Sequence, residues 1–102
     1  MSVYAEVLSD ARSLPVVFDD FADMCGKNKW ALKNELNDRG LTFTDLRNKE
    51  RDKRLMEMSL SRHAVYIAVE FGFRSTGSFY QWHHEYYGFT WTERKKTYGD
   101  SK

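Results

Sequence analysis

A short pattern that occurs twice constrains the fold of this sequence more than any other feature. Each copy has an apolar residue followed by alanine, a glycine five residues after the first position, and a small polar residue beyond it; the copies begin at Phe21 and Ile67. Alanine lets two helices pack closely and glycine permits a tight turn, so each copy predicts a helix-turn-helix unit. One copy alone is equally consistent with a plain helical hairpin. Two copies separated by one long helical stretch favour the helix-turn-helix interpretation.

Turn residues predict an all-α fold of about seven helices. Pro15 is the single proline, most of the six glycines fall where a helix should stop or turn, and no Asn-Gly hairpin signal is present. Thr42 or Thr44 is expected to cap the fourth helix. The expected helices cover about residues 3–12, 17–24, 29–38, 45–59, 63–71, 76–87 and 91–98. We therefore predict three regions: a first helix and helix-turn-helix unit in 1–40, a linker helix in 41–60, and a second unit with a basic tail helix in 61–102.

Apolar spacing predicts which side of each helix faces a core. The residues expected to face inward are Val3, Val7, Leu8, Phe18, Phe21, Ala22, Leu32, Leu36, Val65, Ile67, Ala68 and Phe71. Residues 47–54 of the linker helix are almost all charged. We interpret this run mainly as a solvated helix with ion pairs four residues apart. The functional alternative is a strut with phosphate contacts at one end.

Composition excludes several classes of protein. Hydrophobic residues make up 41% and aromatic residues 16% of the 102 residues, which is enough to form a core, so general disorder is not expected. No apolar run reaches the roughly 18 residues of a membrane span, and the first ten residues do not resemble a signal peptide. Cys25 is the single cysteine, which excludes an internal disulfide or a multi-cysteine zinc site. A reducing, cytoplasmic location is expected.

The charge is unevenly distributed along the chain. The formal net charge is only +1, whereas many nucleic-acid-binding proteins are strongly basic. Residues 1–23 contain five acidic residues and one basic residue, so the rest of the chain is on balance basic. Because charges more than about 10 Å apart are largely screened, the basic body can still attract phosphates locally.

The second repeat carries a resemblance to a known family. Residues 67–88 contain an Ile-Ala start, a Gly-Phe turn, a serine cap, Phe79 and a closing Tyr-Gly, and they resemble the second helix-turn-helix of the AraC/XylS family. Residues 28–32, Asn-Lys-Trp-Ala-Leu, resemble the start of the first recognition helix in its single-domain, MarA/SoxS-like members. The resemblance extends over about residues 14–96. His83 occupies a position where that family usually buries phenylalanine.

The resemblance implies sequence-specific binding of double-stranded DNA and regulation of transcription. One chain would place two recognition helices in successive major grooves, about 34 Å apart, without dimerising. Trp30 could instead be a core tryptophan, and any one of the basic residues could serve solubility alone. The residues expected to contact bases are Trp30, Lys33, Asn34, Thr76, Gly77, Ser78, Tyr80 and Gln81, and those expected to contact phosphates are Lys27, Lys29, Arg47 and Arg74.

Partners and location follow from the same interpretation. We expect no cofactor, no membrane association and no small-molecule effector, since an effector-sensing domain does not fit in this length. A nucleoid-associated location is expected, and RNA polymerase is a candidate protein partner for the acidic N-terminal edge.

Two rival functions stay open. The first is a protein-binding adaptor or antagonist that keeps the fold but has little affinity for DNA, as the near-neutral charge would allow. The second is a small enzyme, such as a nuclease, that uses His63, His83 and His84. Neighbouring histidines on a helix point about 100° apart and rarely share one metal ion, so we expect structural or surface roles for them and no catalytic triad or metal site.

Overall fold

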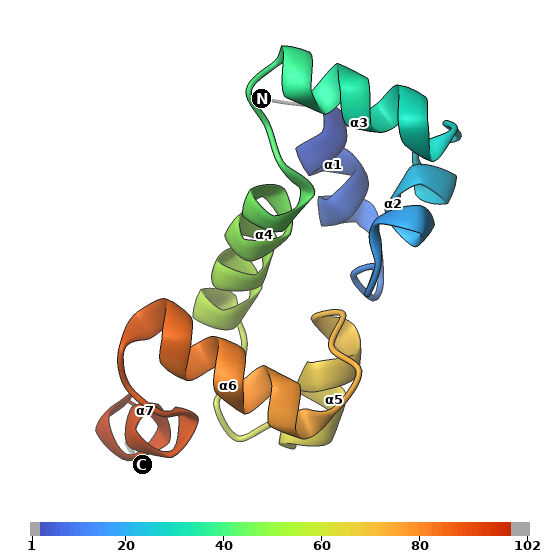
Figure 1. The fold of residues 1–102 in the computed structure, drawn as a ribbon. Helices are drawn as coiled ribbons and strands as arrows, with labels where there is room; N and C mark the ends of the chain where they lie inside the picture. Colours follow the sequence, from blue (N-terminus) through green and yellow to red (C-terminus); the bar gives the residue numbers. More distant parts are fainter. Residues whose placement is uncertain (1–2, 99–102) are drawn as a thin grey trace. The chain divides into compact units, whose positions relative to one another are not determined.

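The computed structural model describes residues 3–98, which form seven helices and no strand, as the all-α prediction requires (Figure 1). The chain divides into two compact units, Met1–Met56 and Glu57–Lys102. No helix within residues 3–98 is both long enough and apolar enough to cross a membrane. The helices are α1 (Val3–Asp10), α2 (Phe18–Met24), α3 (Lys29–Asp38), α4 (Phe43–Glu57), α5 (Ala64–Glu70), α6 (Thr76–Tyr87) and α7 (Trp91–Tyr98).

Local capping explains where the helices begin. The bounds of α3, α6 and α7 agree with those expected from sequence. The Asn28 side chain accepts a hydrogen bond from the backbone N–H of Trp30 at 2.8 Å, and the Ser75 hydroxyl accepts one from Ser78 at 3.1 Å. α4 begins two residues earlier than expected because Thr42, not Thr44, is its cap, with Oγ1 accepting from the backbone N–H of Asp45 at 3.1 Å.

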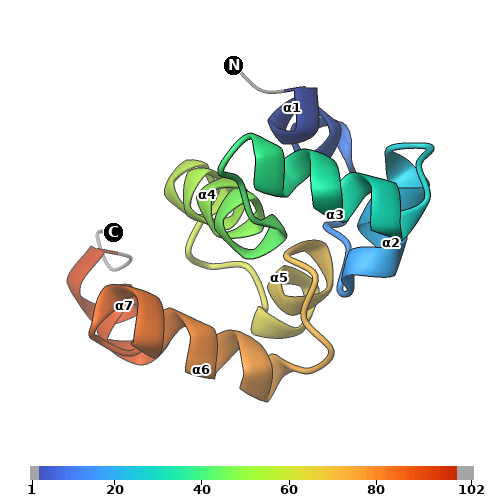
Figure 2. The same cartoon turned by 45° about the horizontal axis from the view of Figure 1, so that its top comes forward.

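The repeated sequence pattern corresponds to a repeated turn. After α2, the backbone N–H of Lys27 donates to the Ala22 carbonyl at 3.0 Å; after α5, that of Phe73 donates to the Ala68 carbonyl at 2.9 Å. These six-to-one hydrogen bonds close helix ends that require a left-handed residue, and the repeat glycines supply it, with φ of +68° in the first turn and +80° in the second. Within the units, α2 packs on α3 and α5 packs on α6 (Figures 1 and 2).

The first unit has its own core, to which α1, α2, α3 and α4 contribute. The prediction for Val3 was wrong: it is 56% exposed, and Tyr4 is buried in its place. Val7, Phe18 and Cys25 pack against the core without being fully buried. The buried residues are Tyr4, Leu8, Leu14, Phe21, Ala22, Leu32, Leu36 and Leu46.

The core of the second unit is mainly aromatic. Phe79 lies at its centre, with its ring centroid 6.1 Å from that of Phe71 and 5.3 Å from that of Trp91. Ile67 and Ala68 of α5 are buried as expected. Val65 was predicted to be buried but is 53% exposed, because α5 turns its other side towards α6.

The charged run in α4 is less solvated than we expected. The Arg54 guanidinium donates to the carbonyls of Leu8 and Ala11 at the end of α1, at 3.0 and 2.6 Å, and pairs with Glu50 at 2.8 Å. Arg51 is buried. The ion pair four residues apart was predicted, but the inward direction of these arginines was not. Arg54 thus supplies side-chain donors to carbonyls at a helix end, where the regular helical hydrogen bonds stop.

Candidate nucleic-acid interface

The helices α3 and α6 have the same arrangement of buried and exposed positions. Counting from the caps Asn28 and Ser75, Leu32 corresponds to Phe79 and Leu36 corresponds to His83. All four of these inward side chains are buried. Residues four apart lie on one side of a helix, so each helix is fixed to its own unit through the same two positions. The opposite side is therefore presented in the same register in both units.

The predicted base-contacting residues lie on those opposite sides. In α3, Trp30, Lys33 and Asn34 are exposed, and their spacing of three and four residues places them on one face. Trp30 is 65% exposed, which excludes the core-tryptophan alternative. Its ring lies under the Lys29 ammonium group, 5.3 Å from the centroid. The face thus offers a flat apolar ring beside one cationic and one amide side chain.

The corresponding face of α6 consists of Gly77, Tyr80 and Gln81, all exposed. These three occupy the positions that Trp30, Lys33 and Asn34 hold in α3. The Gln81 amide donates to the Glu85 carboxylate at 3.1 Å. A carboxylate at this position would repel a DNA phosphate, and it makes the α6 face less basic than the α3 face.

Thr76 and Ser78 lie in the first turn of α6 and are partly buried. The Ser78 hydroxyl is 3.1 Å from the Ser75 hydroxyl, so it takes part in the cap. Both residues lie in the first turn of α6, where the helix dipole favours contacts to phosphate over contacts to bases, although the Ser78 N–H is already bonded to the Ser75 hydroxyl.

Three of the four predicted phosphate-contacting residues are exposed beside these faces: Lys27, Lys29 and Arg74. Lys27 pairs with Glu35 at 3.3 Å and Lys29 pairs with Asp19 at 3.7 Å. Exposed ion pairs of this kind contribute only about 0–1 kcal/mol, so phosphate can replace the carboxylates at little cost.

The assignment of Arg47 to phosphate contact is corrected. Its guanidinium donates to the carbonyls of Pro15 and Val16 at 3.1 and 2.7 Å and lies 4.5 Å from the centroid of the Phe43 ring. Burial lowers the pKa of Arg47 from its ordinary value. These contacts hold the segment between α1 and α2 against α4, so this side chain is structural.

His83 is a core residue with both ring nitrogens occupied. Nδ1 lies 3.0 Å from the Phe89 carbonyl oxygen, and Nε2 lies 2.7 Å from the Arg94 Nε. Since Arg94 can only donate, Nε2 accepts, and Nδ1 carries the proton that it donates to Phe89. Burial lowers the pKa of His83, which favours this neutral form. The interaction joins α6 to α7.

The same contacts exclude His83 as a metal ligand or a catalytic residue. A ring with both nitrogens engaged inside the core can neither bind a metal ion nor transfer a proton to a substrate. His63 and His84 are exposed. Within the described part of the chain, no group of three or more histidine, cysteine, aspartate or glutamate residues is placed to hold a metal ion.

No family model, curated protein or solved structure matches this chain. Function is therefore inferred from the two helix faces themselves.

Proposed function

We propose that the chain is a sequence-specific double-stranded DNA-binding protein that regulates transcription, with α3 and α6 as recognition helices. The observation that carries the proposal is the exposed face that both helices present in the same register from their caps. In α3 this face consists of Trp30, Lys33 and Asn34; in α6 it consists of Gly77, Tyr80 and Gln81. The side chains suit the major groove, where lysine donates to guanine and asparagine or glutamine pairs with adenine.

The two faces would contribute unequally. On or beside α3, the lysines that can contact phosphate or guanine are Lys27, Lys29 and Lys33. Lys27 and Lys29 first have to leave their weak ion pairs with Glu35 and Asp19. Beside α6, Arg74 is the basic candidate, and Glu85 already engages Gln81. Gly77 leaves room for close approach of the helix to DNA, since its Cα hydrogens replace a side chain. We therefore propose that α3 supplies most of the affinity and that α6 supplies a second, weaker half-site.

A selection of bound sequences from random DNA tests the proposal. One chain with two recognition helices should select two short motifs about one helical turn apart. The double change Lys33→Gln with Asn34→Ala should relax the first motif, and Gln81→Ala should relax the second. Each lost base contact should weaken binding by about 1–3 kcal/mol, or roughly 5- to 150-fold.

Lys49→Gln is the matched control for Lys33→Gln, since it removes the same charge from an exposed position of α4. It should leave both motifs intact. Selection of one motif only, or of none, would contradict the proposal. So would equal effects of Lys33→Gln and Lys49→Gln, because a general charge effect carries no sequence information.

A second candidate function is a protein-binding adaptor with the same fold. Val65, Tyr66 and Val69 form an exposed apolar surface on α5, each more than half exposed, and surfaces of this kind occur at protein interfaces. Weak DNA binding that is insensitive to salt would favour this function, because phosphate neutralisation makes DNA affinity fall steeply with salt concentration.

A further inference from the structure

One glycine of the chain is not required by the backbone conformation. Four of the five glycines within residues 3–98 have a φ between +68° and +85°, where any side chain would be strained. Gly77 is the fifth, and it lies in the first turn of α6 with a φ outside this left-handed range. Every residue type can adopt the helical conformation that Gly77 has, so the turn geometry that explains the other four glycines does not explain this one.

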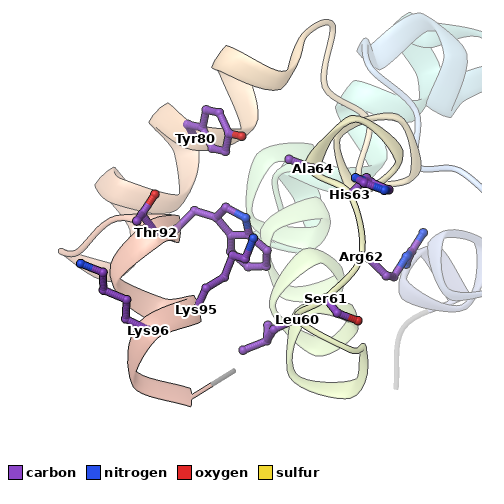
Figure 3. A pocket seen from close by; sticks show the side chains of 10 residues that line it. Leu60, Ser61, Arg62, His63, Ala64, Tyr80, Thr92, Lys95 and Lys96 are labelled. Carbon is purple, nitrogen blue, oxygen red and sulfur yellow. The ribbon is translucent and has the colours of Figure 1, made fainter. Parts of the chain in front are cut away.

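Packing does not require glycine at this position either. Apart from its chain neighbours and the backbone of α6, the nearest atom to a Cβ at residue 77 would be the Ser75 Oγ, at 3.8 Å, which is an ordinary van der Waals contact. Tyr80 lies one turn further along the exposed face, where it lines a hollow between α6, α7 and residues 60–64 (Figure 3). A methyl group at residue 77 would therefore occupy open space on the exposed side of α6.

Glycine at an open helical position is unfavourable for folding. It loses more backbone freedom than alanine when the chain folds, and it adds no side-chain contact. Residues that break a local rule without a gain elsewhere in the fold are expected at functional sites. Glycine on a helix surface is useful where the atoms of another molecule come close to the backbone. Gly77 therefore indicates that another molecule approaches α6 closely at this position.

The corresponding position of α3 has the opposite character. Trp30 lies two residues after the cap Asn28, as Gly77 lies two residues after the cap Ser75. The Trp30 side chain is 65% exposed. Its indole ring keeps the backbone of α3 away from a surface on which this face docks, whereas Gly77 lets the backbone of α6 reach that surface. The two faces share a register but differ in how closely the helix backbone can approach a duplex.

We propose that α6 docks in the major groove with its backbone at Gly77 against the C5-methyl group of a thymine, so that Gly77 determines specificity at the second half-site. The inference rests on the proposed function and names the base that α6 selects. Gly77 offers C–H groups and no side-chain donor or acceptor, so the contact that it makes is apolar. The C5-methyl group of thymine is the apolar group that base pairs present in the major groove.

Adding and removing one methyl group tests the contact, with duplexes that carry the selected motifs. Gly77→Ala should weaken binding to a duplex with both motifs by about fivefold or more, and it should leave unchanged the affinity for a duplex with the first motif alone. Deoxyuridine, which lacks the C5-methyl group, then replaces each thymine of the second motif in turn. At one position the parent should bind the thymine duplex more tightly, whereas Gly77→Ala should bind the uracil duplex more tightly, because the alanine methyl group fills the vacated space.

Urea unfolding separates this role from a role in the fold. Gly77→Ala should raise the ratio of folded to unfolded chain by about twofold, at the low end for glycine in a helix because residue 77 lies in the first turn. Trp30→Ala is the matched change at the corresponding position of α3. It should weaken binding through the first motif, by removing atoms, and should keep the parent's preference for thymine in the second motif.

The outcomes distinguish this inference from the proposed function. A Gly77→Ala variant less stable than the parent would overturn the inference, because glycine would then serve the fold. If both motifs are selected but Gly77→Ala binds like the parent, or reverses no thymine preference, the inference fails and the proposed function stands. If the parent selects no motif, both fail.

Discussion

Acidification should destabilise the second unit through His83. In the folded chain its ring is buried, Nδ1 donates to the Phe89 carbonyl and Nε2 accepts from Arg94. Burial disfavours the charged ring most strongly, a proton on Nε2 would also place a second positive charge against the Arg94 guanidinium, and His84 adds to that unfavourable field. The pKa of His83 is therefore lower in the folded chain than in the unfolded chain, where it is about 6.5.

The sign and size of the effect follow from proton binding. Below about pH 6.5 the unfolded chain takes up a proton at His83 that the folded chain does not, so the stability due to neutral His83 is complete above that pH and is lost as the pH falls towards the folded pKa. The loss approaches 1.4 kcal/mol per pH unit. From about pH 7.5 down to the folded pKa, we therefore expect the free energy of unfolding to fall with decreasing pH through this residue, with at most that slope.

Urea unfolding at several pH values, followed by circular dichroism, measures the effect. His83→Phe should lower stability by about 1–3 kcal/mol at every pH, because Arg94 and Phe89 lose a partner, but it should flatten the pH dependence in this window. His63→Gln changes an exposed histidine that does not act on the His83 ring, and it should keep the parent slope. A His83→Phe variant as acid-sensitive as the parent would refute the reasoning, as would an NMR titration of folded His83 with a pKa at or above about 6.5.

Three further predictions concern single residues, and each is measured by the midpoint of urea unfolding. Gly26→Ala should cost about 1–2 kcal/mol because its φ of +68° strains any residue with a Cβ, even though the space there is open. Arg54→Met should cost about 1.5–3 kcal/mol because it leaves the carbonyls of Leu8 and Ala11 without a charged donor, whereas Lys49→Met, at an exposed position of the same helix, should be nearly neutral. Asn28→Ala should cost about 1 kcal/mol through loss of the α3 cap, and a change below about 0.3 kcal/mol would contradict the capping role.

Local signals in the sequence were sufficient for most helix bounds. The caps Asn28 and Ser75 act on backbone groups two or three residues away, and the left-handed glycines act within one turn. Such effects are visible in a short stretch of sequence. The exposure of Trp30, Lys33 and Gln81 was also predicted correctly, because Leu32 and Phe79 already fix the inward side of each helix.

Contacts between distant segments could not be predicted in the same way. Arg47 and Arg54 turn inward to reach carbonyls more than thirty residues earlier in the chain, and nothing in the charged run itself identifies those acceptors. Val3 and Val65 lie on short helices, where a few apolar residues fit more than one inward side and only the packed neighbours decide. Arg94, the hydrogen-bond partner of His83, lies on the following helix, and no local sequence pattern identifies it as that partner.

The inward arginines change what an approaching polyanion encounters. The formal charge of +1 includes Arg47, Arg51, Arg54 and Arg94, whose guanidinium groups are wholly or largely enclosed. These enclosed guanidinium groups cannot make direct contacts to a DNA phosphate, although their charges still contribute to the field outside the protein. In the proposed DNA-binding role, a duplex would therefore meet a net charge of only +1 at long range and no phosphate contact from these four side chains, so encounter should gain little from electrostatic attraction and the choice of site should depend on short-range fit.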